Sequence, residues 1–229
     1  MITKPKVGMW LGMFRGMGGS ASPRYLLEEN FEADPGYDTA GWTSGGTGTI
    51  NPDYTTIVLR GTQSLYLNAP GGATTTWALS PSFTETSDIW IHFRFRQQTY
   101  WHDDYPVMVS LIYDSTEVAS LQEDLLGTDP RFVIKHGTVS SYGAIGKAIA
   151  TLYHIWIHYI AGTGANGTMS LYVDTDGTRP VGKDCTDITT GSSTNGLTSI
   201  RFRAISGYDA AIIVDQVLIS SSEIIDVDV

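Results

Sequence analysis

The stretch Asp88–Gln97, which reads DIWIHFRFRQ, decides the fold class. Its apolar positions are Ile89, Ile91, Phe93 and Phe95, and the positions between them are Trp90, His92, Arg94 and Arg96. Successive side chains of a β-strand point to opposite faces, so an alternation of this kind predicts a strand with one apolar face. We expect that face to lie in a core.

Neighbouring segments extend the pattern. In Tyr153–Ile160 the residues Tyr153, Ile155, Ile157 and Tyr159 alternate with His154, Trp156 and His158. The glycine-rich turn at 162–167 leads into Thr168–Asp174, which predicts a hairpin. Ala211–Ile219 is almost entirely apolar, which predicts a central strand covered on both faces.

Size and composition agree with an all-β chain. The sequence has 229 residues with 25 glycines, and turn residues separate about a dozen short strand patterns. No helical pattern is convincing, although Gln122–Leu126 is compatible with one helical turn. We predict one all-β domain over residues 25–229, a two-sheet antiparallel sandwich. Cys185 is the single cysteine, which excludes an internal disulfide framework and predicts a buried thiol.

Residues 1–24 differ from the rest and predict an extended N-terminal arm. Five glycines exclude a stable helix, while large apolar side chains stand at Trp10, Leu11, Met13, Phe14 and Met17. The arm carries four basic residues and no acid, which leaves 10 basic and 24 acidic residues, a net charge of −14, in the remainder. We expect the arm to bind another subunit and to drive homo-oligomer assembly. An arm folded back onto its own acidic body is the alternative.

The acidic body limits the classes of partner. Nucleic acids and anionic membranes are bound by basic surfaces, so neither is expected as a partner. No segment reaches the length of a transmembrane helix.

The strand motifs resemble concanavalin A-like, laminin-G-like sandwich domains. The motifs are the hairpin through Met169–Asp174, the closing strand Ile213–Ile219, and the opening segments Asn30–Glu32 and Gly61–Leu67. With the glycine–methionine arm and RYLLEENFE at 24–32, the chain also looks like uncharacterised phage-encoded members. This resemblance implies a virion component made in the host cytoplasm.

The resemblance also implies one structural calcium ion, held by an acid of the first strand and the aspartate of the last. The matching residues are Glu32 and Asp215. An aspartate inside an apolar strand is costly unless it is paired or coordinated, which agrees with such a role for Asp215. We expect no other cofactor.

The polar face of the two longest alternating strands is a candidate binding surface. It presents Trp90, His92, Arg94, Arg96, His154, Trp156 and His158, and the loop at 100–105 adds Trp101. Aromatic rings beside polar groups bind sugars and also anchor protein interfaces. Packing of the tryptophans beneath neighbouring loops is a third interpretation.

Catalysis is not expected from the sequence. Glycosidic hydrolysis uses two carboxylates about 5–9.5 Å apart, and no acid lies between Glu117 and Glu123 to form a pair on one face. The arginine-rich, Gln-x-His and tyrosine motifs of lyase-type sandwiches are also missing. We therefore expect a non-enzymatic phage virion protein, a capsid decoration or tail component, that binds other virion subunits. A glycan-binding module is the alternative, and a polysaccharide lyase or hydrolase is third.

Overall fold

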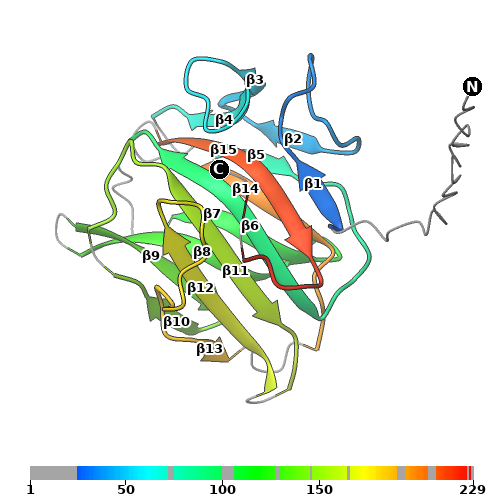
Figure 1. Cartoon of the computed structure of the whole chain (residues 1–229), viewed down its shortest axis with the longest axis vertical. Helices are drawn as coiled ribbons and strands as arrows, with labels where there is room; N and C mark the ends of the chain where they lie inside the picture. The colour runs from blue at the N-terminus through cyan, green and yellow to red at the C-terminus, as the bar shows by residue number, and fades with distance from the viewer. Residues whose placement is uncertain are drawn as a thin grey trace, which may run out of the picture.

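The chain folds as a two-layer β-sandwich, seen in the computed structural model in Figure 1. The described residues are 25–71, 75–99, 106–126, 129–144, 146–163, 166–189, 194–205, 210–225 and 227. The predicted arm, with Trp10, Leu11, Met13, Phe14 and Met17, and the predicted loop residue Trp101 lie outside them.

Sheet A has eight strands, in the order β13-β12-β11-β6-β15-β4-β3, with β1 also pairing with β15. Their bounds are β1 Leu27–Glu29, β3 Thr49–Tyr54, β4 Ser64–Ala69, β6 Asp88–Gln97, β11 Tyr153–Ile160, β12 Thr168–Asp174, β13 Ile188–Thr189 and β15 Ala210–Ser220.

Sheet B has seven strands, in the order β10-β9-β8-β7-β14-β5-β2. Their bounds are β2 Thr43–Gly46, β5 Thr75–Leu79, β7 Val107–Tyr113, β8 Thr116–Leu126, β9 Asp129–His136, β10 Val139–Tyr142 and β14 Ser199–Ile205. All recorded pairings in both sheets are antiparallel.

The predicted sandwich is therefore confirmed, and the alternation that predicted it fills the core. The inward side chains of β6 pack with those of β11, β15 and sheet B, and Ile91 and Phe93 are fully buried. β15 pairs with both β6 and β4 and is buried along its whole length, as its apolar sequence predicts.

The prediction that Gln122–Leu126 could form a helical turn is wrong. These residues continue β8, where they pair with Asp129–Val133 of β9. Cross-strand pairing overrides a weak local preference for helix. The described residues form no α-helix, so no helix in this part of the chain is long and apolar enough to cross a membrane.

Candidate functional site

The predicted binding face lies on the outer side of sheet A and is largely closed. β6 and β11 pair in register, with Trp90 opposite His158 and His92 opposite Trp156. Trp156 is 0% exposed and Trp90 only 7%. Ile224 and Val227 from the C-terminal segment cover both tryptophans together with Tyr172 and Leu218. Packing beneath a neighbouring segment is thus what the structure shows for the two rings.

The histidines and arginines of this face divide into buried and accessible groups. The His92 Nε2 and His154 Nδ1 atoms lie 3.2 Å apart inside the cluster. Arg94 is also buried, and it donates from Nε to Gln216 Oε1 and from Nη1 to the Leu59 carbonyl. Arg96 and His158 remain half-buried, and His158 stacks on Trp90. Of the residues predicted for a glycan or interface role on this face, Arg96 and His158 keep partly exposed side chains, and that role stays a prediction.

Burial sets the ionisation of these groups. Desolvation lowers the pKa of His154 to about 4, and the nearby Arg94 adds to that shift. Desolvation also lowers the pKa of His92 well below its usual value, with further contributions from His154 and Arg94. Both imidazoles are therefore neutral at pH 7, and the cluster is a small second core rather than a charged binding surface.

Glu32 and Asp215, the predicted calcium ligands, are occupied by hydrogen-bond donors. Glu32 accepts from the Thr62 amide and hydroxyl. Asp215 Oδ2 accepts from the Arg60 amide and the Ser64 hydroxyl, and Oδ1 accepts from the Gln216 amide. Donor hydrogens already engage all four carboxylate oxygens, and the described residues contain no metal-binding cluster of three or more Asp, Glu, His or Cys. The predicted ion could bind Glu32 and Asp215 only by displacing these donors.

The outer face of sheet B has a different character, because neutral small residues form its floor and cations stand beside them. Backbone register places four outward residues in one row across four central strands: Arg201 (β14), Ser110 (β7), Ser120 (β8) and Lys135 (β9). Ser110 is 0% exposed and Ser120 2%. Arg201 and Lys135 stand three strand spacings apart, about 14 Å between their Cα atoms.

Two hollows lie on this face. One, of about 520 Å³, is lined by Arg201 together with residues of the 82–85 and 112–115 segments. The other, of about 240 Å³, is lined by Glu117, Ser120, Gln122 and Lys135. We call the row and its two hollows the sheet B face.

Hydrogen bonds, ion pairs and one contact with an aromatic ring hold the charged groups on the outer side of sheet B. Glu117 Oε2 accepts from the Ser110 hydroxyl at 2.5 Å and lies 3.4 Å from Arg203 Nη1. Arg201 places its guanidinium carbon 5.3 Å from the centre of the Trp77 ring. Asp124 and Arg131 form an ion pair at 2.5 Å on the same side of β8 and β9.

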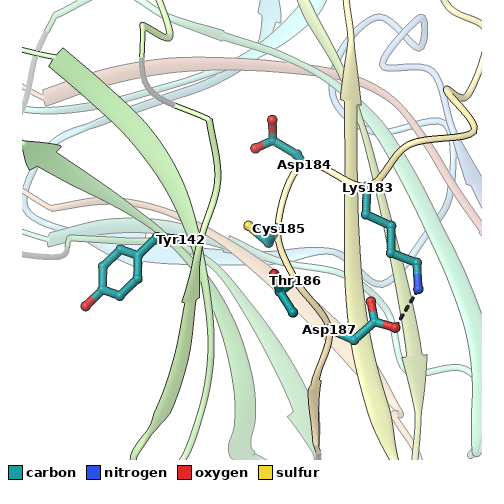
Figure 2. Close-up of a pocket in the computed structure, with 6 residues that line it drawn as sticks. All are labelled: Tyr142, Lys183, Asp184, Cys185, Thr186 and Asp187. Carbon is teal, nitrogen blue, oxygen red and sulfur yellow. Dashed lines mark hydrogen bonds and ion pairs between the residues drawn. The ribbon is translucent and has the colours of Figure 1, made fainter.

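A further recess, of about 490 Å³, lies between β10 and the 183–187 segment (Figure 2). Its charged groups already have partners: Lys183 pairs with Asp187, and Lys147 pairs with Asp184. Cys185 is buried as predicted, and desolvation, with Asp184 adding to it, raises the pKa of its thiol to about 12. A thiol with such a pKa is not a nucleophile near neutral pH, so this recess is structural.

The sheet B face was not predicted from the sequence. Its signal was present, since the alternation in Ser199–Ile205 turns Arg201 and Arg203 away from the core. The partners Ser110, Glu117 and Lys135 come from other strands, and their proximity depends on strand order.

Comparisons with known proteins place the fold. No family model matches the chain, and no curated protein matches by sequence. Among solved structures, the alginate lyase Aly36B is 12% identical with a TM-score of 0.52, covering 81% of this chain and 88% of that one. A carbohydrate esterase from the Shiga toxin-encoding bacteriophage phi24B is 13% identical with a TM-score of 0.56, covering 85% and 97%. The exoplasmic/lumenal domain of VIP36, in its Ca²⁺/Man2-bound form, is 13% identical with a TM-score of 0.53, covering 81% and 83%.

These likenesses confirm the concanavalin A-like sandwich at the level of the fold. They also correct the expectation that the chain is not an enzyme, because solved structures of the same fold include a polysaccharide lyase and a carbohydrate esterase. That expectation depended on missing sequence motifs, and at 12–13% identity the fold is shared although little of the sequence is. One of the three structures described above comes from a phage, which is a weak hint in favour of the resemblance to phage-encoded proteins.

Proposed function

We propose that the chain is an enzyme acting on a polysaccharide that binds across the sheet B face. The observation that carries this proposal is the contrast between the two outer faces. The C-terminal segment covers the aromatic cluster of sheet A, whereas the sheet B face presents two hollows with polar and charged walls. Ligand sites are concave, and a few convergent polar groups in them orient the ligand. The lyase, esterase and lectin of similar fold support a carbohydrate ligand.

The hollow between β8 and β9 holds the groups suited to proton transfer. Lys135 and Glu117 both line it, and within the described residues the Lys135 ammonium has no recorded hydrogen bond or ion pair. An ammonium and a carboxylate facing one substrate provide an acid and a base. We assign these two roles to Lys135 and Glu117, with Ser110 and Arg203 orienting the carboxylate.

A virion location remains part of the proposal. A phage-borne enzyme that degrades a surface polysaccharide would reconcile the phage resemblance with a catalytic sandwich. On this view residues 1–24 attach the enzyme to other virion subunits, and a truncation lacking them should keep its activity but lose its assembly.

The test is turnover of a polysaccharide panel. New reducing ends alone would indicate hydrolysis, unsaturated products absorbing in the ultraviolet would indicate elimination, and released acyl groups would indicate an esterase. We expect one of these products from the wild-type protein and at least a hundredfold lower rate from Lys135→Met. Lys183→Met is the matched control, because Lys183 lies outside the sheet B face, and it should keep the wild-type rate. A Lys135→Met variant that turns over at the wild-type rate would remove Lys135 from the mechanism, and no product from any polysaccharide would contradict the proposed function.

A further inference from the structure

The proposed function leaves open which polysaccharides the sheet B face accepts, and the charges on that face carry an answer. Arg201 is the first part of it. Within the described residues Arg201 forms no ion pair, and its Nε is buried without a hydrogen-bond partner. A half-buried guanidinium with an unsatisfied donor is costly unless a ligand supplies an acceptor.

The position of Arg201 is fixed by its surroundings. Its guanidinium lies over the Trp77 ring, which in turn lies across Gly45 of β2. A Cβ atom on Gly45 would lie 2.7 Å from that ring, so any other residue at this position would force the ring to move. A cation held on an aromatic face is ordered before the ligand arrives, which reduces the entropy lost on binding.

Arg203 adds a second positive charge beside the first. The two arginines are two residues apart on β14, which separates their Cα atoms by about 7 Å on the same side of the sheet. Desolvation lowers the pKa of Arg203, and the proximity of Arg201 contributes to that shift. Glu117 offsets only one of the two charges, since it pairs with Arg203 alone.

The opposite side of the row is also cationic. Lys135 has no recorded acidic partner in the described part of the chain, whereas Arg131 is neutralised by Asp124. Arg201 and Lys135 thus stand at the two ends of the serine row, each without a recorded ion pair in the described residues. Carboxylates also line the hollows: Glu85 and Asp114 beside Arg201, and Glu117 beside Lys135. A cation in a hollow that has no ion pair of its own is available to bind and orient an anionic group of a ligand.

We infer that the substrate is an acidic polysaccharide, and that Arg201 is the residue that selects it by binding a carboxylate or sulfate group of the chain. This inference rests on the proposed function. Arg203 supports the same anion, and Lys135 faces a second acidic group about 14 Å across the row. Planar guanidinium groups bind carboxylate and sulfate oxygens through two parallel N–H donors, which a lysine cannot reproduce fully.

The experiment measures binding of size-matched oligosaccharides by calorimetry: a polyuronate, a sulfated glycan and a neutral glucan. We expect at least one acidic oligosaccharide to bind about tenfold or more tightly than the neutral one, with an affinity that falls as salt rises. Arg201→Gln should abolish that preference, and Arg201→Lys should restore part of it. Lys183→Gln is the matched control for the loss of one positive charge, because Lys183 lies in the recess beside β10 and outside the sheet B face.

The outcomes separate this inference from the proposed function. A polyuronate preference identifies a carboxylate, and a sulfated-glycan preference identifies a sulfate; both support the inference. Equal or tighter binding of the neutral glucan, or an acidic preference unchanged in Arg201→Gln, would overturn the inference and leave the proposed function standing. If none of the three oligosaccharides binds and the polysaccharide panel yields no product, both are overturned.

Discussion

At the scale of single residues, three buried ionisable groups on sheet A respond to pH in opposite ways. Asp215 is 0% exposed, and desolvation raises its pKa from 3.8 to about 7, against the hydrogen bonds from Ser64, Gln216 and Arg60. Desolvation lowers the pKa of His154 from 6.5 to about 4, and His92 shifts the same way. The folded chain therefore binds a proton at Asp215, and fails to bind protons at the histidines, over a shared range of pH.

The sign for Asp215 follows from proton binding. Between pH 3.8 and about 7 the folded state holds a proton on Asp215 that the unfolded state has lost, so stability falls as pH rises through this window. Asp215→Asn removes the titration. The free energy of unfolding of the variant relative to wild type should increase from pH 4.5 to pH 7 by about 1–3 kcal/mol, measured with urea at each pH. A constant difference between the two proteins across that range would contradict the assignment.

The histidines act with the opposite sign. His154 in the unfolded chain binds a proton below about pH 6.5, whereas His154 in the folded chain stays neutral down to about pH 4. The stability that this difference contributes is therefore fully present above pH 6.5 and falls on acidification. His154→Gln should remove part of this acid sensitivity. We expect the pH slope of its unfolding free energy between 4.5 and 6.5 to be smaller than that of wild type by up to about 1.4 kcal/mol per pH unit. An unchanged slope would mean that His154 is protonated in the folded chain.

At the scale of elements, the C-terminal segment closes the outer face of sheet A. Ile224 is 1% exposed against the cluster around Trp90 and Trp156, while its neighbour Ile225 is 48% exposed. Backbone hydrogen bonds from Arg179 to Ile225 and from Val227 to Gly177 tie the segment to the loop after β12. Arg179 reinforces this link by pairing with Glu223 and lying 4.9 Å from the Trp90 ring centre.

The adjacent isoleucines provide a matched test of this closure. Ile224→Ala should lower the free energy of unfolding by about 2–4 kcal/mol, because it empties a buried site beside two tryptophans. Ile225→Ala should change it by less than about 0.5 kcal/mol. Urea titrations followed by tryptophan fluorescence measure both. Equal effects of the two substitutions would show that the segment does not cover the cluster in solution.

Carboxylates also hold the loops near β1 and β4, where the family resemblance suggested calcium. Glu29 accepts from the Phe31, Asp38 and Thr39 amides, and Glu32 and Asp215 bind the loop at 60–64. Since donor hydrogens already satisfy these oxygens, we predict that the melting temperature is the same in excess calcium and in a chelator. A rise of several degrees with calcium would restore Glu32 and Asp215 as metal ligands.

Strands with a clear two-residue period were predictable, and glycine-rich or short ones were not. β6, β11 and β15 follow from their alternation or apolar run, because their pairing and burial both favour an extended chain. β2, which contains two glycines, and β3, which contains a proline, lack that pattern and exist through pairing with β5 and β4. The outward direction of Arg201 was predictable, whereas its neighbours on the sheet B face were not, since strand order is a property of the whole chain.

At the scale of the whole molecule, the two outer faces of the sandwich differ in what covers them. The aromatic face of sheet A, which was expected to bind ligands, adds a second apolar cluster to the fold. The sheet B face keeps polar hollows and two cations, Arg201 and Lys135, that have no recorded ion pair in the described residues. Because stability favours neutral pairing of charges, we attribute these unpaired groups to function.

The most direct test of this account blocks the sheet B face and measures polysaccharide binding by calorimetry. Ser120→Trp places a large ring on the floor of the row, beside Ser110 and Lys135. Thr175→Trp places the same ring at an exposed position after β12 of sheet A and is the control. The account predicts that Ser120→Trp, still folded by circular dichroism, loses binding of the polysaccharide that wild type and Thr175→Trp both retain. Undiminished binding by Ser120→Trp would contradict the assignment of the sheet B face as the site.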